Sequence, residues 1–286
     1  MTLPRVLTSL LIILGVTAAA FVGLCLLLYF WQERFIFYPQ PNDPQLAEQW
    51  KPYRLEIPSG DTSLEGWRAV NPDARTDAVI LYFGGNAEDV LYTLAGARQI
   101  EAKELLAVNY RGYGATRGKP SQRALFADAL AIYDHVVAKE GIDARNIVVM
   151  GRSLGSGIAA MLASERSVRA AILITPYDSL VNVAARHYAI FPVRWLLKHP
   201  FPSAEFAQRT RVPALMVAAE YDTIVPPSHA QRLHEAWKGE SKLHVLSGVG
   251  HNDIERHPDY YALINSFLVE TLGEEVRSRT APRLTD

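Results

Sequence analysis

The chain of 286 residues is poor in cysteine and has no excess of charge of either sign. Its one cysteine, Cys25, excludes an intramolecular disulfide and a cysteine-rich metal site. Ligand motifs such as His-x-x-His and His-Glu-x-x-His are missing, which disfavours a metal-dependent enzyme. The net charge of −1 gives no reason to expect nucleic-acid binding. Neither a P-loop nor Gly-x-Gly-x-x-Gly follows a strand-like segment, so we expect no cofactor.

One long apolar run dominates the N-terminus. From Val6 to Trp31 the sequence has no charged side chain, and about 20 apolar residues are enough to cross the hydrocarbon core of a bilayer. Tyr29-Phe30-Trp31 closes the run with the aromatic side chains that gather at membrane surfaces. We therefore predict that residues 1–31 form a retained single-pass anchor and that the protein associates with a membrane through it.

Three alternatives compete for this segment. A signal peptide could be cleaved near Ala18-Ala19-Ala20, but the apolar run continues well past that point. A lipoprotein site at Cys25 would need a small residue before the cysteine, where the chain has Leu24. A buried core helix of this length would be unusual.

The charges beside the apolar run predict its orientation. Arg5 and the amino terminus precede the run, whereas Glu33 and Arg34 follow it and nearly cancel. The positive-inside rule therefore favours a cytoplasmic N-terminus, with the following domain on the non-cytoplasmic side.

Beyond the anchor, strand-like and helix-like segments alternate. Residues 32–50 hold three prolines and are expected to be an irregular linker. Residues 51–272 contain two antiparallel strands and then strands that alternate with helices, which predicts an α/β domain with a mostly parallel, doubly wound sheet. The expected strands are 53–57, 64–70, 78–83, 105–109, 147–150, 170–174, 213–219 and 243–246. Helices are expected at 88–100 and 121–139, and the polar tail 273–286 is expected to be disordered.

Residues 176–211 break this alternation and are rich in aromatic and basic side chains. The segment lies between two strands, so we expect it above their carboxyl ends, as a lid over the site. A surface helical excursion would fit the same pattern. A lid of this composition suggests contact with lipid or with an acyl chain through residues such as Phe191 and Trp195.

Gly151-Arg152-Ser153-Leu154-Gly155 is the most informative motif. It follows the apolar strand 147–150 and precedes the small-residue helix that begins near Ser156. A Gly-x-Ser-x-Gly in this position is a nucleophile elbow, because a serine on a sharp strand-to-helix turn needs neighbours without a Cβ two residues before and after it. Ser153 is thus the candidate nucleophile.

A serine nucleophile needs a base, and the base needs an acid to orient it. Asp222 and His251 each follow a later strand, so both should lie at the same sheet edge as Ser153. We favour Asp222 as the acid, although it could merely cap a turn. Rival acids are Asp178, Glu220 and Asp253. Histidines that we expect at the surface are His135, His229 and His234.

An oxyanion hole needs two N–H donors aimed at the developing negative charge. One should be the backbone N–H of Leu154, directly after the nucleophile. The second should come from Gly84-Gly85-Asn86-Ala87, with Asn86 as the first choice and Gly85 as a close second. A plain strand-to-helix turn with Asn86 as N-cap would give the same sequence.

With these residues in place, the chain resembles the α/β-hydrolase superfamily, in particular a membrane-anchored branch related to serine aminopeptidase-like hydrolases and to eukaryotic lipid hydrolases and depalmitoylases. Relatives commonly have His-Gly-Asn at the oxyanion loop, where this chain begins with Gly84. The matching segments are 83–87, 109–114, 151–156, 222–226 and 250–253. The resemblance implies an α/β-hydrolase fold with a short helical lid and a Ser-His-Asp triad.

These features predict a serine hydrolase that cleaves esters or thioesters through an acyl-enzyme. The anchor and the lid suggest small-molecule, acyl-lipid or acyl-protein substrates. A serine peptidase or amidase is the alternative within the same chemistry. A catalytically silent scaffold of the same fold is disfavoured, because Ser153, Asp222 and His251 are all present.

Overall fold

The computed structural model of the chain describes residues 5–280. One eight-stranded sheet forms its centre, with the spatial order β1-β2-β4-β3-β5-β6-β7-β8. The pairs β1–β2 and β2–β4 are antiparallel and every other pair is parallel. The strands are β1 Arg54–Ser59, β2 Thr62–Val70, β3 Val79–Phe83, β4 Glu104–Val108, β5 Ile147–Arg152, β6 Ala170–Ile174, β7 Ala214–Ala219 and β8 Ser241–Leu246. All eight expected strands are present, displaced at their ends by at most two residues.

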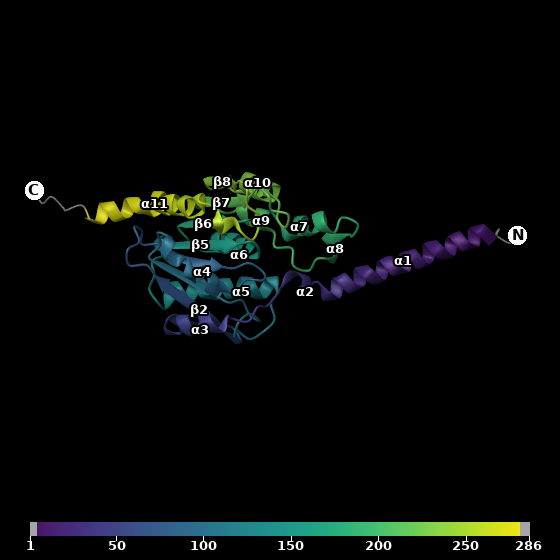
Figure 1. The fold of residues 1–286 in the computed structure, drawn as a ribbon, viewed down its shortest axis with the longest axis horizontal. Coiled ribbons are helices and arrows are strands. Elements are labelled where there is room, and N and C mark those ends of the chain that lie inside the picture. The colour runs from purple at the N-terminus through teal and green to yellow at the C-terminus, as the bar shows by residue number, and fades with distance from the viewer. Residues whose placement is uncertain (1–4, 281–286) are drawn as a thin grey trace, which may run out of the picture.

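Helices cover both faces of the sheet (Figure 1). One apolar core lies against α5, α6, α9 and α10, and a second lies against α4 and α11. The central strands are continuously apolar because they are buried on both faces. The helices of the domain are α4 Val90–Ala95, α5 Gln122–Ala138, α6 Leu154–Glu165, α7 Leu180–His187, α8 Val193–Leu196, α9 Ser203–Ala207, α10 Pro227–Ala236 and α11 Asp259–Thr280.

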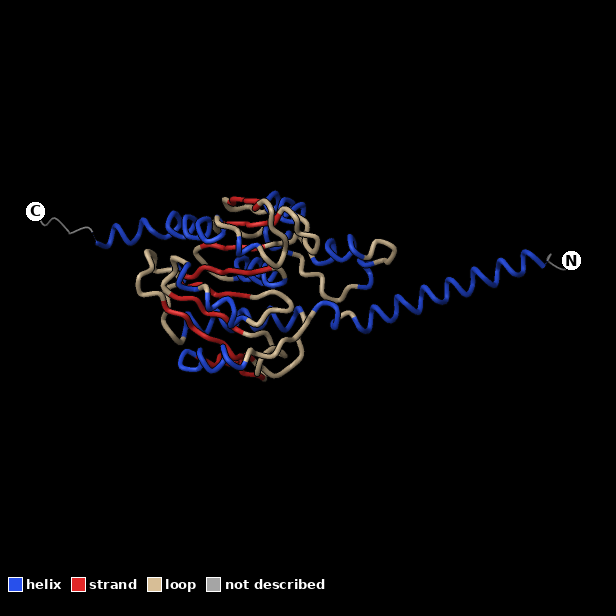
Figure 2. The backbone as a smooth tube through the Cα atoms, viewed as in Figure 1, coloured by secondary structure: helices blue, strands red, loops and turns tan. Residues whose placement is uncertain are grey.

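The N-terminal helix α1, Arg5–Trp31, projects away from the domain (Figures 1 and 2). Its segment Leu7–Trp31 has a mean hydropathy of 2.7 and buries none of its most apolar window within the protein. In residues 5–280 it is the one helix that is long and apolar enough to cross a membrane. It leaves the domain on the side where α7 and α8 lie, whereas α11 extends in the opposite direction.

Three expectations about local structure are wrong. The segment 32–50 holds two short helices, α2 Glu33–Ile36 and α3 Pro44–Trp50, rather than an irregular linker. Its last proline starts a helix instead of preventing one, because Pro44 occupies the first turn, where no intrahelical donor is needed, and Asp43 caps that turn.

The other two differences concern helix ends. The expected helix 88–100 is interrupted at Gly96, so α4 is followed by a separate 3₁₀ turn, Ala97–Gln99. The first part of the tail is helical rather than disordered, because α11 continues through residue 280 from buried turns at Leu268 and Leu272. Residues 281–286 of that tail lie outside the described part of the chain.

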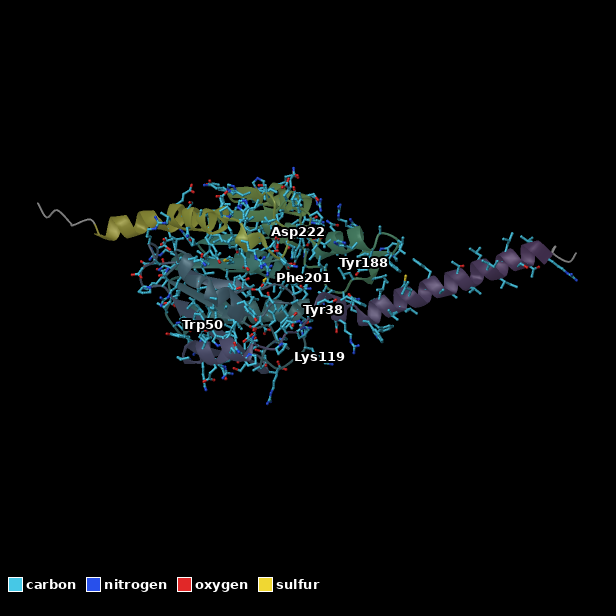
Figure 3. All side chains as sticks on the ribbon, in the orientation of Figure 1. Tyr38, Trp50, Lys119, Tyr188, Phe201 and Asp222 are labelled. Carbon is cyan, nitrogen blue, oxygen red and sulfur yellow. The ribbon has the colours of Figure 1, made fainter. Side chains whose placement is uncertain are left out.

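The segment 176–211 contains α7, α8 and α9, and we refer to this whole range as the lid. Tyr188 lies between the body of the domain and α1, whereas Asp222 lies deeper in the domain (Figure 3). The lid therefore lies between the edge of the sheet and helix α1.

Candidate active site

Ser153 occupies a strained turn between β5 and α6. Its backbone has φ 50° and ψ −116°, a conformation that non-glycine residues rarely adopt. A Cβ at Gly151 would lie 2.2 Å from the carbonyl oxygen of Gly155, and one at Gly155 would lie 2.0 Å from that of Phe83. The two glycines of the motif are thus required by close backbone approach. The turn places Ser153 at the N-terminus of α6, where helix N–H groups are free for an anion.

Three side chains from three loops meet at this turn. The Nε2 atom of His251 lies 2.9 Å from the Oγ of Ser153, and its Nδ1 lies 2.6 Å from the Oδ2 of Asp222. The other carboxylate oxygen of Asp222 accepts hydrogen bonds from the N–H groups of Ile224 and Val225. Asp222 and His251 are 4% and 9% exposed, so water competes little for the contacts between them.

The sheet explains why these distant residues converge. Ser153 follows β5, Asp222 follows β7 and His251 follows β8, and these strands belong to the parallel part of the sheet. Carboxyl ends of parallel strands lie at one edge. The structure therefore brings together the three residues that the sequence predicted at this edge.

Asp178, the rival acid after β6, belongs to a different cluster. Its carboxylate lies 2.6 Å from Nδ1 of His229 and accepts hydrogen bonds from Arg232 and Asn182. Burial opposes ionisation of Asp178, but these partners outweigh it and hold the pKa of Asp178 well below its ordinary value. The expectation that His229 lies at the surface is wrong, since pairing with Asp178 leaves it 2% exposed.

The remaining rival acids cap backbone groups. Glu220 accepts a hydrogen bond from the N–H of Gly248, and Asp253 accepts one from the N–H of Gly250. Both carboxylates thus stabilise the loop that carries His251 instead of pairing with its ring. The other histidines that were expected at the surface, His135 and His234, are half-buried.

The two candidates in the oxyanion loop differ in their hydrogen bonding. The N–H of Gly85 donates to Oε2 of Glu88 at 2.7 Å, so it is already engaged. Within the described part of the chain, the N–H of Asn86 has no hydrogen-bond partner. The Asn86 side chain donates to the carbonyl of Ile36 at 3.1 Å. Asn86 and Leu154 therefore offer the available donors, and Gly85 does not.

Two tyrosines of the segment 109–114, for which the sequence predicted no role, hold this loop in place. The hydroxyl of Tyr110 donates to the carbonyl of Gly84 at 2.7 Å, and that of Tyr113 donates to the carbonyl of Asn86 at 2.6 Å. Burial raises the pKa of both hydroxyls, so both stay protonated donors. Fixing the carbonyl of Asn86 also fixes the loop that presents its N–H.

Glu88, for which the sequence predicted no role, is the central residue of a polar network. Its carboxylate accepts hydrogen bonds from Tyr82, Thr93 and the N–H of Gly85, and it pairs with Arg152 at 3.2 Å. Burial lowers the pKa of the Arg152 guanidinium, but Glu88 outweighs that effect and the pKa is raised. Glu88 belongs to no short motif and to no regular spacing of residues, so the sequence alone does not indicate its role.

The network links three loops of the site. Arg152 precedes Ser153, donates to the carbonyl of His251 at 3.2 Å and pairs with Glu88 beside the oxyanion loop. Glu88 also lies close to Gly84, since a Cβ at Gly84 would lie 3.2 Å from the carboxyl carbon of Glu88. A side chain at position 84 and the present position of Glu88 therefore compete for space.

Comparison with known proteins identifies the family. A family model described as the alpha/beta hydrolase fold matches residues 83–201, and one described as TAP-like protein matches residues 190–274. The chain belongs to the α/β-hydrolase family.

Relatives and solved structures of this family include proteins from distant organisms. An uncharacterized protein of Mycobacterium tuberculosis is 32% identical over 267 residues, which cover 91% of this chain and 95% of that protein. Human alpha/beta hydrolase domain-containing protein 17C is 29% identical over 68% of this chain and 58% of its own length. The structure of a Pyrococcus furiosus esterase superposes with a TM-score of 0.67 at 17% identity, covering 83% of this chain and 98% of that one.

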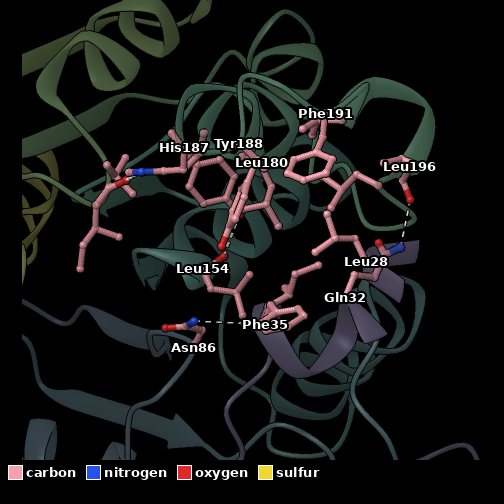
Figure 4. Close-up of a pocket in the computed structure, with 18 of the residues that line it drawn as sticks. Leu28, Gln32, Phe35, Asn86, Leu154, Leu180, His187, Tyr188, Phe191 and Leu196 are labelled. Atoms are coloured by element: carbon pink, nitrogen blue, oxygen red, sulfur yellow. Dashed lines mark hydrogen bonds between the residues drawn. The ribbon is translucent and has the colours of Figure 1, made fainter. Parts of the chain in front are cut away.

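Two hollows that differ in the side chains lining them meet at Ser153 in this α/β-hydrolase. An apolar cavity of about 680 Å³ lies under the lid and is lined by Ser153, Leu154, Tyr177 and side chains of α7, α8 and α1 (Figure 4). A second hollow of about 780 Å³ lies on the other side of Ser153, and we call it the polar cleft because Asn86, Arg152 and His251 are among the residues that line it. Among the described residues, no group of three or more His, Cys, Asp or Glu side chains is placed to hold a metal ion.

Proposed function

We propose that this α/β-hydrolase is a serine hydrolase that cleaves carboxylic esters or thioesters through an acyl-enzyme. The observation that carries this proposal is the chain of contacts from Asp222 through His251 to Ser153, which ends where the apolar cavity meets the polar cleft. An ester has an acyl part and a leaving part, and the two hollows offer a separate compartment for each.

The mechanism follows from the positions of the atoms. With Nδ1–H of His251 donating to Asp222, its Nε2 is free to take the proton of Ser153 as Oγ attacks the acyl carbon. The tetrahedral oxyanion accepts hydrogen bonds from the N–H groups of Leu154 and Asn86. His251 then protonates the leaving oxygen or sulfur, so that an alcohol or thiol departs. Asp222 stabilises the imidazolium that exists between these two proton transfers.

Hydrolysis of the acyl-enzyme repeats these steps with water as the nucleophile. His251 removes a proton from the water, the same N–H groups hold the second oxyanion, and Ser153 leaves with the returned proton. The polar cleft beside His251 provides the route for this water after the leaving group departs. Accumulation of the acyl-enzyme would appear as a burst of the first product.

The test compares hydrolysis by the full-length protein in detergent with that of Ser153→Ala and Ser164→Ala. Ser164 lies on the same helix as the candidate oxyanion donor, and its hydroxyl bonds only to the carbonyl of Met161 among the described residues. We expect p-nitrophenyl esters to be hydrolysed by the wild type and by Ser164→Ala but not by Ser153→Ala. Faster cleavage of matched p-nitroanilides would instead favour a peptidase or amidase, and no turnover of either would favour a silent scaffold.

We also propose that α1 spans a membrane and that the hydrolase domain lies on its non-cytoplasmic side. The support is an unburied apolar helix with Arg5 before it and nearly cancelling charges after it. A domain of this size buries enough core to fold without disulfides. Protease added outside intact cells should digest the domain, whereas digestion only after lysis would reverse the orientation.

A further inference from the structure

The domain alone does not enclose the apolar cavity beside Ser153. One wall consists of Leu24, Leu27 and Leu28 of α1, and the facing wall belongs to the lid, with Leu180 and Phe191 among its residues (Figure 4). A helix whose role was only to tether the domain would not need to line the substrate side of the site. The cavity therefore depends on how α1 and the lid are held together.

A buried glutamine fastens the helix to the lid. Gln32, directly after α1, is 6% exposed. Its side-chain amide donates to the carbonyl of Leu196 at 2.9 Å, and its oxygen accepts from the N–H of Lys198 at 2.7 Å. The ammonium of Lys198 also lies 4.3 Å from the ring centroid of Tyr29. Together, these contacts of Gln32 and Lys198 fix the orientation of α1 relative to the lid.

The lid also contacts α1 well inside its apolar run. The rings of Phe21 and Phe191 are stacked with centroids 5.7 Å apart. Phe21 precedes Trp31 by a rise of about 15 Å along the helix axis. Beside this contact, Ile190 and Trp195 of the lid are 76% and 87% exposed. If Trp31 marks the membrane surface, the tip of the lid lies at the depth of the hydrocarbon.

We propose that the substrate is an ester or thioester whose long acyl chain lies in the bilayer, and that this chain reaches Ser153 between α1 and the lid without crossing water. The inference rests on the proposed function. Leu24 and Leu28 then set how much chain the cavity accepts, because they line it at lipid depth. The polar cleft on the opposite side of Ser153 receives the leaving group at the membrane surface.

The experiment uses the full chain reconstituted in phosphatidylcholine vesicles. For each variant, kcat/KM is measured with p-nitrophenyl hexadecanoate and with p-nitrophenyl butanoate on the same preparation, so that their ratio does not depend on the fraction of active protein. Leu28→Trp fills the cavity from α1. Leu26→Trp is the matched control, since Leu26 lies on the same helix, is 52% exposed and does not line the cavity.

We expect Leu28→Trp to lower the ratio of hexadecanoate to butanoate about tenfold, because an added ring removes room for the chain in an apolar pocket. Leu26→Trp should stay within about twofold of the wild type. An unchanged ratio in Leu28→Trp, or an equal fall in both variants, would overturn the role of α1. Absence of hydrolysis of both esters by the wild type would instead remove the proposed function.

A second measurement does not depend on a substitution. A fluorophosphonate with a hexadecyl chain and a terminal diazirine is added to the vesicles, allowed to react with Ser153 and then photolysed. We expect the second cross-link, mapped by mass spectrometry, in the peptides of α1 or of the lid segment 187–197. Cross-links confined to the polar cleft, around Tyr38 and Asn42, would contradict this path for the chain.

Discussion

The sheet edge and the lid surround Ser153 from two sides with different kinds of contact. On the sheet edge, polar side chains are buried and paired, as in the contacts of Asp222 with His251 and of Glu88 with Arg152. On the lid side, leucine and phenylalanine side chains surround an apolar space, and Gln32 supplies two of the hydrogen bonds. Under the proposed function, the first region would govern the chemistry and the second would govern the choice of substrate. Changes at the sheet edge should then lower kcat for every ester, whereas changes at the lid should act through acyl-chain length.

The largest expected effect distinguishes two buried aspartates of the sheet edge. Asp222→Asn should lower kcat about 10⁴-fold, because the amide no longer orients and stabilises His251. Asp178→Asn should keep kcat within about twofold once activity is normalised to folded protein, because Asp178 pairs with His229 instead. Ester hydrolysis by the two purified variants checks this, and similar losses in both would contradict the separation of their roles.

The next effect concerns the network behind the oxyanion loop. Glu88→Gln removes the charge that pairs with Arg152 while keeping nearly the same shape. Because Glu88 acts through Gly85 and Arg152, we expect kcat to fall about tenfold to hundredfold with little change in KM. The fall should be equal for butanoate and hexadecanoate esters. A rise in KM for the long ester alone would place Glu88 on the side of substrate choice.

A smaller effect is expected at the contact between α1 and the lid. Gln32→Leu leaves the carbonyl of Leu196 and the N–H of Lys198 without these partners. KM for the hexadecanoate ester in vesicles should rise roughly fivefold, since the loosened lid no longer closes the cavity. Gln45→Leu, at an exposed position far from the lid, provides the control. Equal changes in KM for long and short esters would contradict a role of this contact in the choice of acyl-chain length.

The pH dependence of stability provides the mildest test. The folded-state pKa of Asp178 is depressed below its ordinary value of 3.8, so its pairing with His229 and Arg232 stabilises the protein above that pH and is lost as pH falls through the depressed pKa. At pH 7, Asp178→Asn should cost about 3 kcal/mol of unfolding free energy. Thermal melts should show this difference shrinking below about pH 4. A constant difference down to pH 3 would contradict the assignment.

The sequence predicted the sheet edge because its signals are local. Ser153 directly follows β5, Asp222 follows β7 by a short turn, and His251 lies in the loop after β8. A parallel sheet must bring such positions to one edge. The Gly-x-Ser-x-Gly spacing also follows from sterics, as the close approaches at Gly151 and Gly155 show. The central strands of the sheet were predictable from a local signal too, since burial on both faces makes them continuously apolar.

The missed features depend on contacts between distant parts of the chain. Gln32 bonds to Leu196, which is 164 residues away, and no pattern around Gln32 announces that partner. Glu88 and Tyr110 gain their roles only when three loops meet, and the burial of His229 depends on Asp178 after another strand. Pro44 does not prevent regular structure as expected, because a proline is tolerated in the first turn of a helix although it breaks later turns.

The measurement that tests the account most directly is labelling of the full-length protein with a fluorophosphonate probe, followed by peptide mapping. A serine attacks this probe only when a neighbouring base activates it. We predict a single modified residue, Ser153, with labelling abolished in Ser153→Ala and nearly abolished in His251→Ala. Absence of labelling in folded protein, or label on a different residue, would contradict the proposal that Ser153 and His251 form the reactive centre.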